Sequence, residues 1–252
     1  MAAQTKHAKK AGGIFIGCSG WAYASWKPDF YPPALSSKKF LEYYATQLNS
    51  VEVNYTFRSL PAESVVRAWL DAAGPEFRFS FKAPQRITHL SRLKNCREAL
   101  AALIGALAPV QAADRLGVIL FQLPPNMKAD AERLGGFFKD AAAVGFGQDL
   151  RMAFEFRHES WFEEETYSLL REYAAALCVA ESDELTTPEV HTADFSCYRL
   201  RKSTYTDSDL EAVGKRLRAR ARAGDVFAYF KHEEEPVGAL RARAVLHGLK
   251  RA

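Results

Sequence analysis

The 252-residue chain has 48% hydrophobic and 25% charged residues, a composition typical of a globular protein with a sizeable core. No apolar run approaches the roughly 20 residues that a membrane-spanning helix requires, which argues against a membrane protein. The formal net charge is +4, but three lysines lie in residues 1–13, where there is no acid. The rest of the chain is nearly neutral, which argues against a large basic surface for nucleic acid.

Residues 1–13 are rich in lysine and alanine and lack the apolar segment of a secretory signal. We expect these residues to form a disordered basic tail, followed by one domain over residues 14–252. The four cysteines form no C-x-x-C pair, and most of them lie in apolar, strand-like segments; they are Cys18, Cys96, Cys178 and Cys197. Because buried reduced thiols suit a reducing compartment, we expect a cytoplasmic protein.

Eight short apolar segments predict eight strands, and helical patterns separate most of them. The predicted strands are 14–18, 51–54, 77–82, 116–123, 151–157, 177–180, 195–201 and 226–231. The helical patterns cover 36–48, 62–73, 98–113, 130–144, 160–176, a segment around 210–221 and a last helix that starts near Pro236. Ser160 and Glu163 have the spacing of a capping box at the start of the fifth helix.

This alternation favours parallel strands that are joined by helical crossovers. Eight units in 252 residues give about 31 residues per unit, close to the size of a closed eight-unit barrel. Residues 182–194, between the sixth and seventh strands, are too few for a full helix and include Pro188. We therefore predict a single α/β domain, a TIM-barrel-like parallel barrel of eight strands whose sixth helix is short or missing.

Residues 151–161 contain an apolar strand with one carboxylate, Glu155, inside it. Side chains alternate between the two faces of a strand, so Glu155 and Arg157 share one face while Phe154 and Phe156 share the other. A carboxylate and a guanidinium on one face of an apolar strand need a polar environment. The segment therefore predicts a pocket at the end of this strand.

The other predicted strands also end in polar residues. In parallel barrels the C-terminal strand ends and the loops after them build the active site. The candidate catalytic residues are Glu155, Glu52, Lys82 and Arg157. The candidate substrate-binding residues are Ser19, Trp21, Tyr23, Asn54, His89, Gln122, Trp161, Glu181, Arg199 and Lys231. The alternative is that the charges form ion pairs inside the barrel without catalysis, for instance Glu155 with Lys82 or Arg199.

Aromatic residues crowd the loop after the first strand. Trp21 and Tyr23 lie nearest the strand end, so we expect them to contact a ligand ring. We expect Phe30 and Tyr31, farther along this loop, to belong to a small core that closes one mouth of the barrel.

A metal site is one possibility at these strand ends. Glu52, Glu155 and Glu181 with His158 offer ligands to a divalent ion, but the cations that share this space would repel it. The chain also has no P-loop, G-x-G-x-x-G or G-x-S-x-G motif. We therefore expect neither a metal nor a cofactor.

Several short motifs run along the chain. They are Ile-Gly-Cys-Ser-Gly-Trp at 16–21, Tyr-x-x-Trp-x-x-x-Phe-Tyr-Pro at 23–32, Val-Glu-Val-Asn at 51–54, Phe-Lys-Ala-Pro at 81–84, Thr-His at 88–89, Gln-Leu-Pro-Pro at 122–125, Glu-Phe-Arg-His-Glu-Ser-Trp at 155–161, Tyr-Arg-Leu at 198–200 and Tyr-Phe-Lys-His-Glu at 229–233. Together they resemble the domain of unknown function 72 family, also called YecE-like. The resemblance implies a TIM-barrel-like fold and no established activity. Two positions depart from the family pattern: Glu181 stands where many members have Asp, and Arg201-Lys202 where many have His-Gly.

Our leading hypothesis is a metal-independent acid–base enzyme that acts on a small anionic, sugar- or phosphate-like substrate at the C-terminal mouth. Glu155 or Glu52 would act as general acid or base, while Asn54 and Gln122 would orient hydroxyl groups. Substrate oxygens would be held by Lys82, Arg157, Arg199 and Lys231. The alternative is a barrel that binds or processes nucleic acid, with the same cations on phosphates and the first-loop aromatics on bases.

Overall fold

The computed structural model describes residues 11–147, 150–231 and 235–251, and its eight strands pair in parallel. The strands are β1 (Ile14–Cys18), β2 (Ser50–Val53), β3 (Arg78–Lys82), β4 (Leu116–Gln122), β5 (Arg151–Glu155), β6 (Ala176–Glu181), β7 (Ser196–Leu200) and β8 (Val226–Phe230). The helices are α1 (Phe40–Gln47), α2 (Glu63–Ala72), α3 (Arg97–Ala112), α4 (Ala131–Ala143), α5 (Glu164–Glu172), α6 (Asp207–Ala221) and α7 (Val237–Arg251). Each predicted strand is present, with its ends within two residues of the predicted ones.

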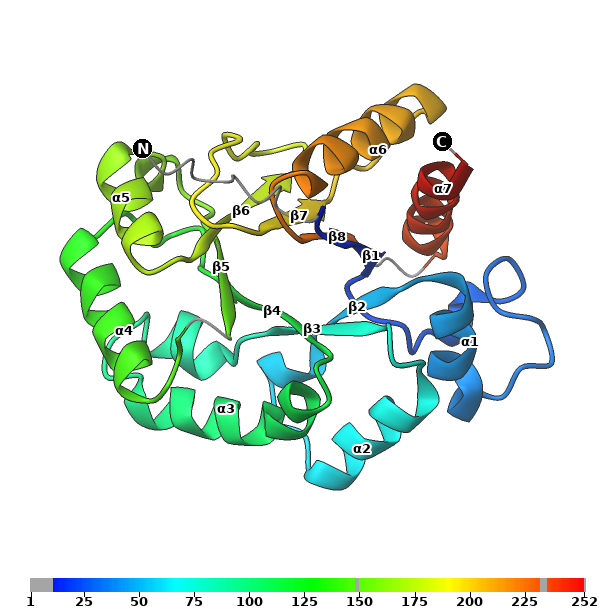
Figure 1. Ribbon diagram of the computed structural model, residues 1–252, viewed down its shortest axis with the longest axis horizontal. Coiled ribbons are helices and arrows are strands. Elements are labelled where there is room, and N and C mark those ends of the chain that lie inside the picture. The colour runs from blue at the N-terminus through cyan, green and yellow to red at the C-terminus, as the bar shows by residue number, and fades with distance from the viewer. Residues whose placement is uncertain (1–10, 148–149, 232–234, 252) are drawn as a thin grey trace, which may run out of the picture.

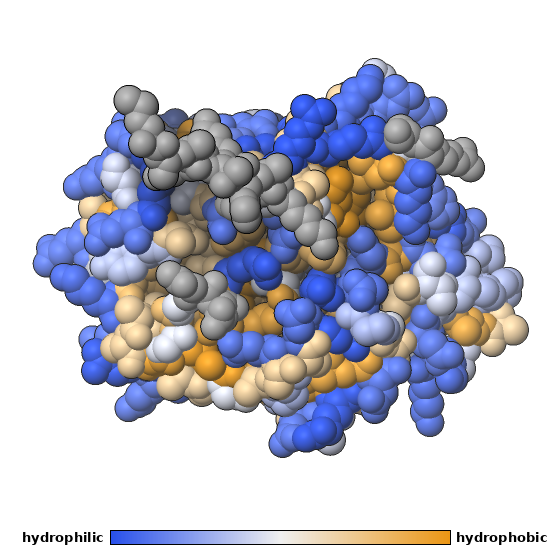
Figure 2. Space-filling model, viewed as in Figure 1, coloured by the Kyte–Doolittle hydropathy of each residue, from blue (hydrophilic) through white to orange (hydrophobic). Residues whose placement is uncertain are grey.

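The strands follow the order β1-β8-β7-β6-β5-β4-β3-β2 around the sheet, and the helices lie outside them (Figure 1). This is a TIM-barrel-like α/β fold, as predicted. The segment between β6 and β7 contains no helix and only an isolated bridge between Glu181 and Thr186, so the sixth helix is missing. Hydrophilic residues cover the outer rim of the face shown in Figure 2, and apolar residues gather toward its middle.

Side chains close the seam between β1 and β2, the two edges of the sheet. The Asn49 side chain accepts a hydrogen bond from the Ile16 N–H at 2.7 Å. The Tyr44 hydroxyl accepts from the Cys18 N–H at 2.7 Å and donates to the Ser50 carbonyl at 3.0 Å. These contacts satisfy edge groups that a neighbouring strand would otherwise satisfy, and they leave the barrel nearly closed.

The interior of the barrel is filled below its C-terminal mouth. An apolar layer consists of Val118, Leu120, Ala153, Ala176, Cys178, Phe195, Cys197 and Phe227. Three hydroxyls lie beside it, where Tyr229 contacts Ser50 at 2.7 Å and Ser80 at 2.6 Å. The four cysteines are all buried and free, as expected. A well-packed layer of side chains therefore lies directly below the charged residues of the mouth.

The start of α5 differs from the prediction. Ser160 does not cap this helix, because its hydroxyl accepts a hydrogen bond from the Ala129 N–H at 2.9 Å. The N-cap is Glu163, which makes no capping bond with its side chain. A capping box is found instead at α6, between Thr206 and Asp209.

The N-terminal segment is described only from residue 11. The predicted disorder of residues 1–10 lies outside the described residues. Gly12 and Gly13, which the tail prediction included, are hydrogen-bonded to the Ala221 carbonyl and the Asp225 carboxylate at 2.7 and 2.8 Å. Within the described chain, none of the helices has the length and apolar character to cross a bilayer.

Candidate functional site

A buried ion-pair network occupies the C-terminal mouth of the barrel. Arg199 on β7 donates one hydrogen bond to Glu52 on β2 at 2.7 Å and another to Glu155 on β5 at 2.5 Å. All three side chains are nearly inaccessible to solvent. Glu155 faces the barrel interior, while Phe154 and Phe156 pack in the outer core, so the predicted alternation on β5 is confirmed.

Further arginines surround Glu155. Arg157 donates from Nε to Glu155 at 2.9 Å and from Nη2 to the Gln122 side-chain oxygen at 3.1 Å. That oxygen also accepts from Arg199 at 3.2 Å. Arg201, which was not among the predicted site residues, approaches Glu155 at 4.0 Å. The network spans strands that are distant in sequence, as the polar strand ends predicted.

These contacts determine the ionisation of Glu155. Burial opposes the charged form, but Arg199, Arg157 and Arg201 outweigh it and lower the pKa of Glu155 to about 2. A carboxylate that is ionised at neutral pH and already bound by two arginines is poorly suited to exchange a proton with substrate. The low pKa favours an anchoring role for Glu155, and the acid–base role expected for Glu155 or Glu52 stays a prediction.

Lys82 at the end of β3 has different surroundings. Its ammonium lies 4.1 Å from the centre of the Phe57 ring, and among the described residues no carboxylate comes within 4 Å of it. Burial is the main cause that lowers the pKa of Lys82 to about 8, and the positive charge of Arg199 adds to it. Lys82 is therefore a lysine whose proton is exchangeable near neutral pH.

His89 is a second neighbour of the Phe57 ring. Its imidazole packs edge-to-face on Phe57, with ring centres 5.1 Å apart, and its Nδ1 lies 2.9 Å from the Thr88 hydroxyl. Burial, followed by the charges of Lys82 and Arg157, holds the pKa of His89 below its ordinary value. The imidazole of His89 and the ammonium of Lys82 thus both pack against the Phe57 ring, and no pattern in the sequence pointed to Phe57.

The loop that carries His89 has an unusual backbone. Residues 86–90 form one wide helical turn, and three non-glycine residues with positive φ follow it: Arg92 at 47°, Leu93 at 67° and Asn95 at 51°. Such strained conformations persist where the surroundings enforce them, and they are frequent at functional sites.

Two buried acceptor atoms on β2 and just after it have no hydrogen-bond partner among the described residues. They are Glu52 Oε2 and Asn54 Oδ1. The amide of Asn54 donates to the Ser19 carbonyl at 3.0 Å, which orients its oxygen. The Ser19 hydroxyl lies 3.3 Å from the Phe230 carbonyl. Unpaired buried acceptors have a high desolvation cost, so they favour a donor such as a ligand hydroxyl or a water.

The first-loop aromatics separate as the sequence indicated. Phe30 and Tyr31 are buried and belong to an aromatic cluster in which Tyr31 stacks on Phe40 at 4.2 Å. Trp21 is half-buried and packs edge-to-face against Trp69, and Tyr23 is half-buried beside Trp26.

Two candidate residues lie apart from the network. Trp161 is fully buried, stacks on Phe156 at 4.5 Å and donates its indole N–H to the Met127 carbonyl at 2.7 Å, so it is a core residue and not a ligand contact. Glu181 pairs with Arg216 of α6 at 2.6 Å, because the last residue of β6 points to the outside of the barrel.

The remaining candidate, Lys231, follows β8 and is exposed. Its N–H donates to the Leu200 carbonyl at 3.0 Å, which ties the end of β8 to β7. Within residues 11–147, 150–231 and 235–251, no three His, Cys, Asp or Glu side chains converge as metal ligands would.

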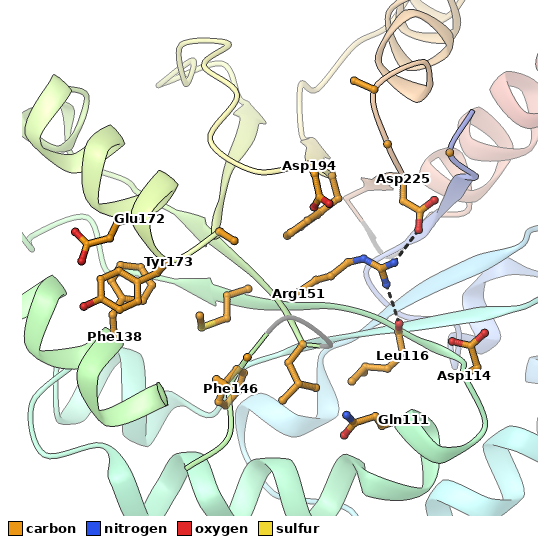
Figure 3. A pocket seen from close by; sticks show the side chains of 18 of the residues that line it. Gln111, Asp114, Leu116, Phe138, Phe146, Arg151, Glu172, Tyr173, Asp194 and Asp225 are labelled. Atoms are coloured by element: carbon orange, nitrogen blue, oxygen red, sulfur yellow. Dashed lines mark hydrogen bonds and ion pairs between the residues drawn. The ribbon is translucent and has the colours of Figure 1, made fainter. Parts of the chain in front are cut away.

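A large cavity lies at the opposite, N-terminal end of the barrel, with a volume of about 970 Å³. Figure 3 shows Arg151 pointing across it toward Asp225, with which it pairs at 2.9 Å, and toward the Leu116 carbonyl. Most of the lining residues lie just before the strands or at their first residues. Because this end of such barrels serves stability, the charged mouth is the better candidate for chemistry.

Comparison with known proteins places the chain in a family. The model of the family described as "Protein of unknown function DUF72" matches residues 15–252. UPF0759 protein YecE of Escherichia coli K12 is 33% identical over 111 residues, which are 44% of this chain and 38% of that protein. UPF0759 protein YunF of Bacillus subtilis 168 is 28% identical over 166 residues, which are 63% of this chain and 57% of that protein. The chain thus matches less than two thirds of the length of these relatives.

Solved structures show the same fold. A DUF72 family protein from Thermotoga maritima superposes with a TM-score of 0.83 at 23% identity, over 94% of this chain and 99% of that one. The similarity of the folds agrees with the barrel described above. The chain belongs to the DUF72 family, a family of proteins of unknown function, as its motifs led us to expect.

Proposed function

We propose that this protein is a metal-independent acid–base enzyme whose substrate is a small anionic, sugar- or phosphate-like molecule bound at the C-terminal mouth. The observation that carries the proposal is Lys82, an amine that has no carboxylate partner among the described residues and whose pKa is lowered to about 8. General acid–base catalysis is most efficient when the pKa of the catalytic group lies near the working pH. Lys82 meets that condition, whereas Glu155 does not.

An excess of positive charge at the mouth supports an anionic substrate. The mouth holds four cations, Lys82 and three arginines, and Glu52 and Glu155 balance two of these charges, so an excess of two positive charges remains. The side chains of Arg157 and Arg201 are 30% and 23% exposed, so each is partly accessible to a ligand. A guanidinium binds phosphate or carboxylate oxygens in a bidentate manner.

The two unpaired acceptor atoms described above would bind the hydroxyl groups of the substrate. Glu52 Oε2 and Asn54 Oδ1 would each accept a hydrogen bond from a substrate hydroxyl. Arg199 acts here as a positioning residue, because it holds Glu52 and Glu155 in place without reaching solvent itself. These contacts favour a hydroxylated anion over a purely apolar acid.

A thermal-shift panel at low salt tests the proposal. It would contain inorganic phosphate, small carboxylates, sugar phosphates, and single- and double-stranded oligonucleotides. A ligand at 100 times its dissociation constant stabilises by about 2.7 kcal/mol, or roughly 5–10 °C for a chain of this size. We expect such a shift with a small anion in the wild type and its loss in Arg157→Gln.

The matched control is Arg67→Gln, which removes an exposed arginine of α2 that pairs with Glu63. This variant should keep the full shift. Stabilisation by oligonucleotides alone, with a steep dependence on salt, would replace the proposal with the nucleic-acid alternative. Equal shifts in Arg157→Gln and the wild type would refute the assigned anion site.

A further inference from the structure

We propose that Lys82 is a covalent catalyst: its amine condenses with the carbonyl carbon of an anionic aldehyde or ketone to form an imine. The inference rests on the proposed function and deepens it, because it assigns a carbonyl group to the substrate. It also gives Lys82 a nucleophilic role in addition to proton transfer.

The surroundings of Lys82 are those of a nucleophilic amine. The two carboxylates that face it, Glu52 and Glu155, are both engaged by Arg199, so neither holds the amine as an ammonium ion in an ion pair. The Phe57 ring forms an apolar wall 4.1 Å from Nζ. Desolvation against an aromatic surface, next to other cations, is a recognised way to activate a lysine.

Imine formation needs a neutral amine, a proton carrier and a group that binds the anionic substrate. The neutral amine adds to the carbonyl carbon to give a carbinolamine, the nitrogen loses its proton, and the hydroxyl is protonated and leaves as water. His89, whose imidazole packs on the same Phe57 ring, would carry this proton. Arg157 and Arg201, both partly exposed, would bind the anionic group of the substrate while the carbonyl reacts.

Charge balance at the mouth is consistent with this chemistry. The charged groups that act on Lys82 are the carboxylates of Glu52 and Glu155, which favour the ammonium form, and the guanidiniums of Arg199 and Arg157, which oppose it. At pH 7 a lysine with a pKa of about 8 is neutral roughly 10% of the time, against roughly 0.03% for a lysine at 10.5. The neutral amine is thus on the order of 300-fold more abundant at Lys82 than at an exposed lysine.

Reductive trapping tests the inference. The protein would be incubated at pH 7 with pyruvate and sodium cyanoborohydride, and peptide mapping by mass spectrometry would follow modification at each lysine. We expect Lys82 to be modified on the order of tenfold faster than the exposed lysines or more. We also expect pyruvate to be preferred over methyl pyruvate at Lys82 alone, because the ester lacks the anionic group. Exposed lysines such as Lys39 are internal controls in the same sample, so the result does not depend on the folding of a variant.

Inorganic phosphate separates the inference from the proposed function, because it is an anion without a carbonyl. Slower trapping in phosphate, together with phosphate stabilisation of the wild type but not of Arg157→Gln, would support both. If phosphate stabilises the protein but Lys82 is modified no faster than the exposed lysines, imine formation at Lys82 is overturned, while the proposed anion-binding site is still supported. Rapid modification that ignores both phosphate and the charge of the ketone would overturn the assignment of an anionic substrate.

Discussion

Replacement of Arg199 by methionine should destabilise the protein strongly. The change leaves Glu52 and Glu155 buried without the hydrogen bonds at 2.7 and 2.5 Å that now compensate their charge. Removal of one partner from a buried ion pair costs about 3–5 kcal/mol. For a chain of this size that corresponds to a fall in melting temperature of roughly 6–20 °C. Urea unfolding at pH 7, followed by circular dichroism, measures the free energy directly.

A second variant shows whether the uncompensated charge is the cause. Addition of Glu52→Gln and Glu155→Gln to Arg199→Met removes both charges and should restore at least half of the lost stability. The deficit of Arg199→Met alone should also shrink as the pH falls, because a buried carboxylate without its arginine takes up a proton more easily in the folded than in the unfolded state. An Arg199→Met variant with a free energy of unfolding within 0.5 kcal/mol of the wild type, on the order of a surface substitution, would contradict the compensating role of Arg199.

Three further predictions concern other parts of the molecule. The pKa of Lys82 is about 8 in the folded state and 10.5 for an ordinary lysine, so between these pH values the unfolded state binds more protons. The stability of the wild type should therefore rise with pH in this range relative to that of Lys82→Met. Urea midpoints that change equally with pH in both proteins from pH 7 to 10.5 would contradict this. Tyr44→Phe should cost about 2–4 kcal/mol of stability, because it leaves the Cys18 N–H and the Ser50 carbonyl unpaired at the β1–β2 seam. Hydrogen exchange of the β1 amides should then accelerate, and unchanged exchange would contradict a role of Tyr44 in closing the seam. Trp161→Phe should lower stability by about 1–3 kcal/mol and leave anion binding unchanged in the thermal-shift panel; loss of binding would return Trp161 to the site.

The fold follows from the sequence because its signals repeat. Each strand has its own apolar segment, and the even spacing of eight units favours one architecture. The polar strand ends also predicted where charges gather, since the C-terminal ends of parallel strands meet at one mouth. Position alone thus identified Glu52, Glu155 and Arg199 as neighbours.

The roles of these residues were harder to predict. Whether Glu155 carries a proton depends on which cations reach it, and three arginines, one on β7 and two just after β5 and β7, lower its pKa. The outward direction of Glu181 follows from β6 continuing to that residue, one residue beyond the predicted strand end. Trp161 looked like a mouth residue because of its motif, but its short turn folds back onto the core.

The contact between Phe57 and Lys82 was likewise not predictable from the sequence. Phe57 follows β2 in a short turn with no periodic pattern, and it reaches Lys82 only because β2 and β3 are neighbours in the sheet. The lowered pKa of Lys82 is therefore a property of the folded mouth and not of any motif.

The role of Lys82 as the reactive amine of the mouth is tested most sharply by the titration of Lys82 itself. Reductive methylation with carbon-13 formaldehyde gives each lysine an NMR signal, and the Lys82→Arg variant identifies the one that belongs to Lys82. We predict a midpoint near pH 8 for this signal and an upward shift when inorganic phosphate is added, because a bound anion stabilises the ammonium form. A midpoint near 10.5, the ordinary lysine value, would contradict it, as would a midpoint that phosphate leaves unchanged.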